Sequence, residues 1–296
     1  MTRVAVLGPG GVGGFVAAAL VRAGVSTTVV ARAETAAAIA ERGLRVSSVR
    51  MGDFVAHPAA TARLDDEVDV LVVATKATTL AAALERIDCA PGLVVPLLNG
   101  LDHLAALRER FGPRAVAATI RIESDRTEPG AIVQTSPGYR VELASDHPAP
   151  RPRMAAFADA LRGAEIPARL GDTEARVLWS KLVRLNALAC TTAAYDLPLG
   201  AIREHPRRRL DLEGAVDETA AVANAEGAGI AADDTLRELW EAHPGLGSSM
   251  RRDVAAGREP ELDAIAGAVL RHGVAHGLAC PTVERLAGRI RERLEG

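Results

Sequence analysis

The length, composition and charge of the chain limit what it can be. Its 296 residues suffice for one large or two medium domains, and 48% of them are hydrophobic, enough to fill a sizeable core. A net charge of −3 gives no global field that would attract nucleic acid or an anionic membrane. No apolar run reaches the roughly 18–20 residues that span a bilayer. From the charge and the apolar runs together, we expect neither nucleic acid nor a membrane as a partner.

The N-terminus and the cysteines indicate a cytoplasmic protein. The opening MTRVAVLGPGGVGG has one arginine and a glycine cluster, and no cleavage site of small residues follows it. Cys89, Cys190 and Cys280 are odd in number and far apart in the sequence. This spacing argues against a disulfide framework and against a C-x-x-C metal site, so we expect three buried thiols and no metal.

Strand and helix patterns alternate along the first part of the chain. Apolar or β-branched runs predict strands at 3–7, 26–31, 68–74, 92–98, 115–122, 131–144 and 166–170. Helical patterns fall between them, at 15–24, 35–42, 78–87, 102–111 and 154–163. The alternation predicts an α/β fold with a doubly wound, mainly parallel sheet, whose later strands are antiparallel.

After Gly171 the pattern becomes wholly helical. Asp172 or Thr173 can cap a helix that runs toward Ala194, and later breaks fall at Pro198, at Pro206, at 227–229 and at 243–247. The domain boundary is therefore expected near residue 170, with a sheet domain over 1–170 and an all-α domain over 171–296. Because no low-complexity linker separates them, we expect close packing with a cleft between the domains.

A glycine-rich turn follows the first predicted strand. Gly8, Gly10 and Gly13 form a G-x-G-x-x-G pattern between a strand and a helix, the context that makes this motif specific for a dinucleotide. The first glycine permits the tight turn, the second lets the backbone approach a pyrophosphate, and the third lets the helix pack on the strand. We therefore predict a Rossmann-type domain whose cofactor contacts include Gly8, Pro9, Gly10, Gly11, Val12 and Gly13.

The end of the second predicted strand favours NADP over NAD. Enzymes that use NAD usually carry a carboxylate there, to accept hydrogen bonds from the ribose 2′-hydroxyl. Here the strand ends Val29-Val30-Ala31-Arg32, and Glu34 comes two residues too late. Arg32 can instead pair with a 2′-phosphate.

Lysine is rare in this sequence. Of its 35 basic residues only Lys76 and Lys181 are lysines. Arginine can replace lysine at most solvated positions, but not where a compact ammonium must fit a small space or donate a proton. Lys76 follows the strand 68–74 and Asn99 follows the strand 92–98, so both are expected at the ligand-binding edge of the sheet. Lys181 lies on the first helix of the second domain.

Five blocks of the sequence stand out in order. They read LGPGGVGG, VVATKA, PLLNGLD, LWSKLVRLNAL and GLGSSMRRDVAAGREPELDAIAG, and they are spread over nearly the whole chain, from residue 7 to residue 267. In order and spacing they resemble the ketopantoate reductase family. The resemblance implies NADPH-dependent reduction of ketopantoate (2-dehydropantoate) to pantoate in pantothenate biosynthesis. It also implies a C-terminal domain like that of 6-phosphogluconate dehydrogenase.

The resemblance assigns roles position by position. Lys181 matches the catalytic lysine, and Asn99 matches the asparagine that contacts both cofactor and substrate. Ser249 matches the substrate-binding serine, and Glu261 matches the glutamate near the nicotinamide ribose and the reacting centre. Lys76 matches a lysine on the cofactor side of the cleft. An ammonium, with a pKa of about 10.4 in water, can polarise a keto group and donate the proton that its reduction requires.

The match to the family is incomplete around Lys181. Many members carry asparagines four and eight residues later, where this chain has Leu185 and Ala189, and Ala266 stands where an asparagine is common. Asn186 is one residue out of step, a rotation of about 100° on a helix, and is the remaining candidate for a substrate contact there. The polar set facing the substrate is thinner than usual, which leaves the identity of the keto acid open.

Two other functions remain open at this point. One is an NADP-dependent reductase of another keto or imino acid, such as an opine-type dehydrogenase. The other is a non-catalytic protein that senses NADPH. His272 and His276 are spaced i, i+4, but a zinc site would need a third ligand. A homodimer through the helical domain is an analogy at the level of the fold.

Overall fold

The computed structural model describes residues 2–295 and divides the chain into two compact units. The first unit runs to Leu98 and resumes from His103 to Val177; the second contains Asn99–Asp102 and the chain from Leu178 onward. The division falls within helix α6 (Glu174–Tyr195), shortly after the boundary expected near residue 170.

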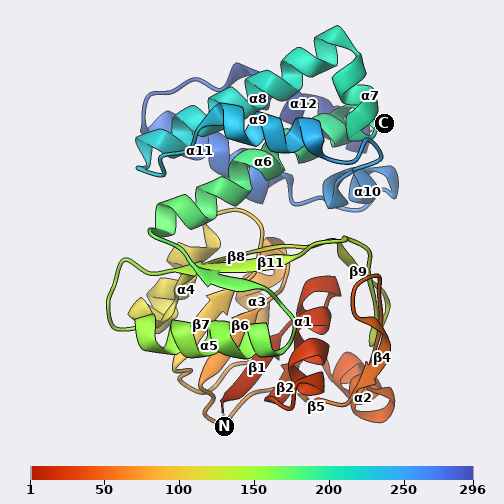
Figure 1. Cartoon of the computed structure of the whole chain (residues 1–296), viewed down its shortest axis with the longest axis vertical. Helices are drawn as coiled ribbons and strands as arrows, with labels where there is room; N and C mark the ends of the chain where they lie inside the picture. The colour runs from red at the N-terminus through yellow and green to blue at the C-terminus, as the bar shows by residue number, and fades with distance from the viewer. Residues whose placement is uncertain (1, 296) are drawn as a thin grey trace. The chain divides into compact units, whose positions relative to one another are not determined.

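A five-stranded parallel sheet forms the centre of the first unit (Figure 1). Its strands lie in the order β5 (Ala59–Thr61), β2 (Ser26–Val30), β1 (Arg3–Leu7), β6 (Val70–Val73) and β7 (Leu93–Pro96). Strands β6 and β7 are buried along their whole length, as expected for strands covered on both faces. The apolar runs in the sequence thus predicted four of these five strands, and β5 was missed.

Helix α1 (Gly11–Arg22) packs between this sheet and a second one. The second sheet has the order β4 (Gly52–Ala56), β3 (Leu44–Ser48), β10 (Ala131–Gln134) and β9 (Ser124–Glu128). The inner face of α1 consists largely of glycine and alanine, which lets the helix approach both sheets closely.

A third sheet corrects one of the predicted strands. It has the order β12 (Ala168–Leu170), β11 (Arg140–Ala144) and β8 (Ala117–Arg121), with β8 and β11 antiparallel as expected. The prediction of one strand over 131–144 is wrong, because β10 and β11 belong to different sheets. The break falls at Ser136-Pro137-Gly138, where proline cannot donate to a strand ladder.

Four more α-helices and two 3₁₀ turns complete the described part of the first unit. They are α2 (Ala33–Arg42), the 3₁₀ turn η1 (Ala77–Thr79), α3 (Leu80–Leu84), α4 (His103–Phe111), the 3₁₀ turn η2 (Gly112–Arg114) and α5 (Arg151–Gly163). The helix predicted over 78–87 is therefore the pair η1 and α3. Helix α5 packs on β11 and β12, and α4 packs on β7.

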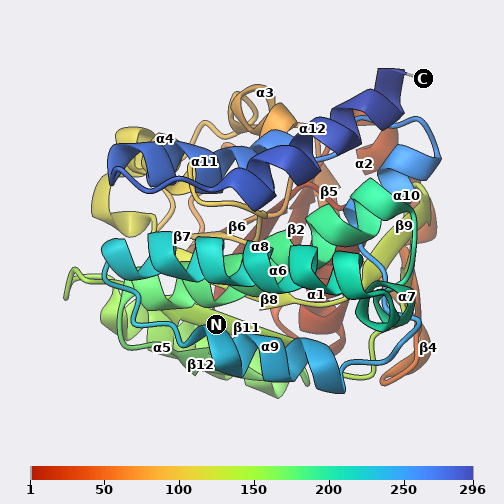
Figure 2. The same cartoon turned by 90° about the horizontal axis from the view of Figure 1, so that it is seen from above.

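The second unit is helical, as the sequence predicts. After α6 come α7 (Leu199–Glu204), α8 (Pro206–Ala225), α9 (Ala232–Glu241), α10 (Ser249–Ala255), the π-helical turn η3 (Asp263–Gly267), α11 (Ala268–Ala275) and α12 (Pro281–Glu295). Helix α8 packs against α9, α11 and α12 (Figure 2). Among the described helices, none combines the length and the apolar character that crossing a bilayer requires.

Candidate active site

The structure gives a different reason for glycine at each of the three positions of the motif. Gly8 has φ +90°, which favours glycine, and its amide donates to the Val30 carbonyl at 3.0 Å. A Cβ on Gly13 would lie 2.2 Å from the Gly8 carbonyl oxygen, so only glycine lets α1 pack this closely. A Cβ on Gly10 would meet nothing within 4 Å. The turn is therefore tight where the motif requires it and open at the position where a pyrophosphate approaches.

Two further features of the turn fit a nucleotide. Gly10 is the N-cap of α1, and as a glycine it has no side chain that could occupy the first helical amides. Beside Gly8, the Thr75 hydroxyl is buried with no hydrogen-bond partner among residues 2–295, and the Thr75 methyl group would lie 2.8 Å from a Cβ on Gly8. A buried polar atom of this kind normally has a partner, and a bound dinucleotide could supply one. The residues present therefore fit the cofactor that the motif implies.

Arg32 and Lys76 lie at the same edge of the central sheet as the turn. In the parallel registers Leu7 is level with Val30 on β2 and with Val73 on β6. Arg32 follows β2 as the N-cap of α2, and Lys76 follows β6 as the N-cap of η1; both side chains are exposed. The Arg32 guanidinium has no hydrogen-bond or ion-pair partner within the described part of the chain. It is thus available to an anion.

Asn99 and Glu261 meet within the second unit. The Asn99 Nδ2 donates to Glu261 Oε2 at 2.9 Å, although 162 positions separate the residues in the sequence. Both side chains are partly buried. The neighbouring Gly100 has φ +84°, and a Cβ there would lie 2.2 Å from the Ala264 carbonyl oxygen. The predicted role of Glu261 beside Asn99 is consistent with this contact.

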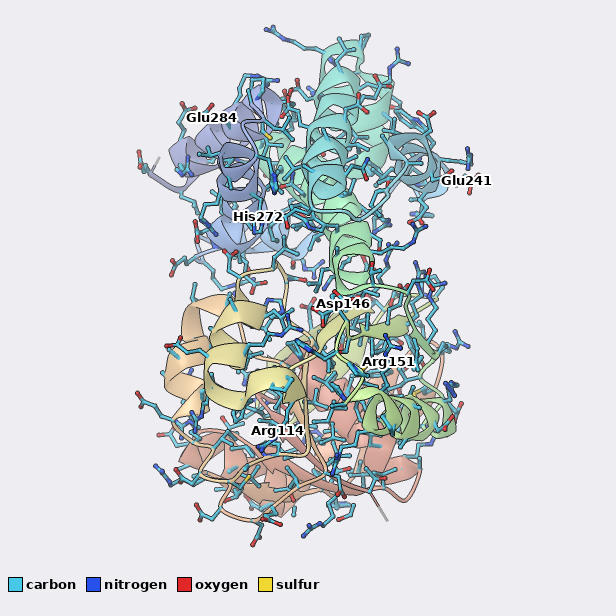
Figure 3. The ribbon with its side chains drawn as sticks, turned by 90° about the vertical axis from the view of Figure 1, so that its left-hand side faces the viewer. Arg114, Asp146, Arg151, Glu241, His272 and Glu284 are labelled. Atoms are coloured by element: carbon cyan, nitrogen blue, oxygen red, sulfur yellow. The ribbon has the colours of Figure 1, made fainter. Side chains whose placement is uncertain are left out.

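Lys181 lies two turns into α6, and its side chain is half-buried. The helix begins where the sequence predicts: the Thr173 hydroxyl accepts from the Arg176 amide at 3.1 Å. Two more hydrogen bonds join Glu174, the first residue of the helix, to Asp146, which is labelled in Figure 3. The Glu174 amide donates to the Asp146 carboxylate at 3.3 Å, and the Asp146 amide donates to the Glu174 carboxylate at 3.0 Å. These caps fix the start of the helix that carries Lys181.

The side chain of Asn186 is buried and hydrogen-bonded inside the helical unit. Its side chain is fully buried, its Nδ2 donates to the Thr219 hydroxyl at 2.9 Å, and its Oδ1 accepts from the Cys190 thiol at 3.2 Å. Ala189, at one of the family's asparagine positions, is also fully buried, and Leu185 is half-buried. Both ends of the Asn186 amide are thus bonded to neighbouring side chains rather than to Asn99 or Glu261, and its substrate contact stays a prediction.

Burial should make Cys190 unreactive in the folded protein. Burial raises the pKa of the Cys190 thiol to about 12, so only roughly one thiol in 10⁵ is ionised at neutral pH. Cys280 is buried as well, whereas Cys89 is half-buried rather than buried as predicted. Iodoacetamide labelling followed by mass spectrometry should modify Cys89 first and Cys190 only after unfolding in urea. Native labelling of Cys190 as fast as Cys89 would contradict this packing.

The two serines at the start of α10 have different roles. The Ser248 hydroxyl caps α10 by accepting from the Arg251 amide at 3.0 Å, and it also pairs with the Thr192 hydroxyl at 2.8 Å. Ser248 is buried, whereas Ser249 is exposed. Of the pair, Ser249 is therefore the one that remains accessible to a substrate, and its substrate contact stays a prediction.

Several residues at the site carried little signal in the sequence. Thr75 lies beside Lys76 in the VVATKA block, but the resemblance assigns it no role. Ser124 donates from its hydroxyl to the Gly11 carbonyl at 2.8 Å, and a Cβ on Gly11 would lie 2.1 Å from the Ser124 carbonyl oxygen. This contact explains the additional glycine at position 11, but the sequence alone gives no reason to pair it with Ser124.

Comparisons with known proteins agree on one family. The family model described as "Ketopantoate reductase PanE/ApbA" matches residues 4–145, and its C-terminal counterpart matches residues 175–294. A 2-dehydropantoate 2-reductase of Mycobacterium tuberculosis is 32% identical, covering 100% of this chain and 99% of its own. One of Halobacterium salinarum is 29% identical, covering 98% of both.

Solved structures agree with the sequence comparisons. A 2-dehydropantoate 2-reductase from Geobacter metallireducens superposes with a TM-score of 0.89 at 28% identity, covering 98% of this chain and 99% of its own. A D-mandelate dehydrogenase with NADH and anilino(oxo)acetate also reaches 0.89, but at 21% identity, covering 99% of this chain and 98% of its own, which supports the fold alone. The family indicates an oxidoreductase with a nicotinamide cofactor. The chain belongs to the ketopantoate reductase family.

Proposed function

We propose that this protein reduces ketopantoate to pantoate with NADPH, the step that supplies pantothenate biosynthesis. The observation that carries the proposal is the hydrogen bond between Asn99 and Glu261. The family resemblance assigns both residues to one reacting centre, and the fold brings them together from distant parts of the sequence. The glycine-rich turn, open at Gly10, supports the nucleotide part of the proposal.

The chemistry needs a hydride, a proton and an oriented keto acid. When bound, the reduced nicotinamide supplies the hydride for C2 of the keto acid. Lys181 hydrogen-bonds to the keto oxygen through its ammonium and donates the proton as the oxygen becomes a hydroxyl. Asn99 and Glu261 orient the reacting groups, and Ser249 binds the substrate. General acid catalysis of this kind contributes about 10²–10⁴-fold to the rate.

Arg32 should set the preference for NADPH. Its exposed guanidinium can form charge-assisted bonds with the 2′-phosphate, each worth about 1.5–3 kcal/mol. Arg32→Ala should therefore raise the KM for NADPH by roughly 10- to 100-fold while the KM for NADH changes little. Arg42→Ala, an exposed arginine at the other end of the same helix, is the matched control. Equal effects of Arg32→Ala on both cofactors would remove this assignment.

A substrate panel with purified protein tests the proposed function. Ketopantoate, other branched and aryl 2-keto acids, and imino acids formed from keto acids and amines are each assayed by NADPH oxidation. We expect the highest kcat/KM with ketopantoate. A higher value for another keto or imino acid would identify a different reductase. Tight NADPH binding without oxidation by any member of the panel would identify a sensor.

A further inference from the structure

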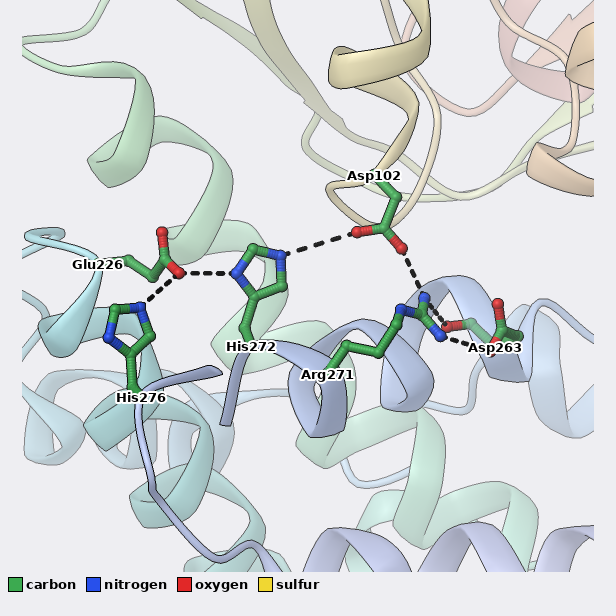
Figure 4. A network of polar contacts seen from close by, with 6 residues as sticks. All are labelled: Asp102, Glu226, Asp263, Arg271, His272 and His276. Atoms are coloured by element: carbon green, nitrogen blue, oxygen red, sulfur yellow. Dashed lines mark hydrogen bonds and ion pairs between the residues drawn. The ribbon is translucent and has the colours of Figure 1, made fainter. Parts of the chain in front are cut away.

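Asp102 lies at the centre of a charged network in the helical unit (Figure 4). Its Oδ2 accepts from Arg271 Nη2 at 2.5 Å, and its Oδ1 lies 3.7 Å from His272 Nε2. Arg271 also donates from Nη1 to the Asp263 carboxylate at 2.7 Å and from Nη2 to the Asp263 carbonyl at 3.1 Å. One carboxylate three residues after Asn99 is thus linked to both α11 and η3.

The same four-residue segment, Asn99–Asp102, touches the π-helical turn at a second point. The Gly100 backbone lies so close to the Ala264 carbonyl that a side chain could not be accommodated there. Glu261, the partner of Asn99, lies just before this turn. The segment is therefore held at Gly100 by packing and at Asp102 by charge, and Asn99 projects from its beginning onto Glu261.

His272 links the network to two further helices. Its Nδ1 lies 2.7 Å from the Glu226 carboxylate, which His276 Nε2 also contacts at 2.8 Å. Its ring meets Trp179 of α6 edge to face, with the centroids 5.5 Å apart. Trp179 is almost fully buried, so one face of the His272 environment is the packed interior of the helical unit.

We propose that Asp102 is a positioning residue, which keeps Asn99 on Glu261 by binding Arg271 and His272. The structural role of Asp102 does not depend on the proposed function, whereas its expected effect on the kinetics rests on it. Loss of the Asp102 carboxylate leaves the segment held only by the packing of Gly100 and of the buried Leu101, so the Asn99 amide samples orientations away from Glu261. Because small displacements of orienting groups slow catalysis strongly, the kinetic effect should be large for a residue outside the reacting centre.

Asparagine-selective ¹⁵N labelling gives a direct readout, because Asn99, Asn186 and Asn224 are the only asparagines in the sequence. In Asp102→Ala we expect the Asn99 side-chain amide signals to shift or broaden. The Asn186 and Asn224 signals should stay, since those amides bond to Thr219 and to the Ile230 carbonyl. Arg271→Met, which removes the partner instead, should perturb the same Asn99 signals.

Kinetics supply the second readout. Asp102→Ala should lower kcat/KM for the keto acid by roughly tenfold, mainly through kcat, with the thermal midpoint nearly unchanged. Asp102→Glu should recover part of this loss. Asp234→Ala removes another exposed carboxylate, paired with Arg237 on α9, and is the control that should change neither readout.

The two readouts separate this inference from the proposed function. Unchanged Asn99 signals in both Asp102→Ala and Arg271→Met would overturn the positioning role, whatever the protein reduces. A wild-type protein that oxidises NADPH with none of the keto acids would overturn the proposed function, and the Asn99 signals would still decide the role of Asp102.

Discussion

Replacing Lys181 with alanine should lower kcat by about 10²–10⁴-fold, the usual contribution of a positioned general acid. Lys181→Arg should be nearly as slow, because a guanidinium keeps the charge but does not give up its proton at neutral pH. Binding of NADPH, measured by the change in its fluorescence, should be retained in both variants. The effect would then lie on the chemical step rather than on the fold or the cofactor.

Two controls make the Lys181 prediction specific. Arg176→Ala removes a cation from the first turn of the same helix, where the side chain is exposed, and should leave kcat unchanged. Added methylamine should restore part of the turnover of Lys181→Ala, since a free ammonium can enter the vacated space and donate the proton. Near-normal turnover in Lys181→Ala or Lys181→Arg would exclude the acid role.

Replacing single glycines of the glycine-rich turn with alanine should distinguish the positions that stabilise the fold from the position that only binds the cofactor. In Gly13→Ala the new Cβ would lie 2.2 Å from a backbone oxygen, so we expect a loss of about 1–3 kcal/mol in the free energy of unfolding together with loss of NADPH binding. In Gly10→Ala the Cβ meets no protein atom, and φ is −74°, which alanine tolerates. Its stability should be normal, but NADPH affinity should fall at least about tenfold, because the methyl group occupies the pyrophosphate's approach.

Gly288→Ala is the control for these two variants. Gly288 lies within α12, and a Cβ there also meets nothing within 4 Å. Alanine at a helix interior is favoured over glycine by roughly 0.5–1 kcal/mol, so this variant should be slightly more stable and bind NADPH normally. Urea unfolding and cofactor titration of the three variants give the comparison. Normal NADPH affinity in Gly10→Ala would contradict a nucleotide at this turn.

Four of the five strands of the central sheet were predictable because they are short apolar or β-branched runs bounded by turn residues. The smaller strands were not. Strand β3 alternates buried and exposed residues over only five positions, and β9 (SDRTE) contains no apolar residue at all. An edge strand of this kind forms because β10 offers it a hydrogen-bonding partner, which its own sequence cannot reveal.

The parts of the site also differ in how far the sequence could predict them. The glycine-rich turn is local, and the spacing of its glycines follows from the backbone geometry that each position needs. The approach of Glu261 to Asn99 was implied by the family resemblance rather than by any local pattern. Arg271 and Asp102, 169 positions apart, carry no pattern that links them, since they meet only because the π-helical turn and α11 bring them together.

A crystal structure of the complex with NADP⁺ and pantoate tests the central claim most directly. We predict that the Lys181 Nζ lies about 2.6–3.2 Å from the hydroxyl oxygen that derives from the keto group, at hydrogen-bonding distance for proton transfer. A complex in which the Lys181 amine points into bulk solvent and another side chain binds that oxygen would contradict the account.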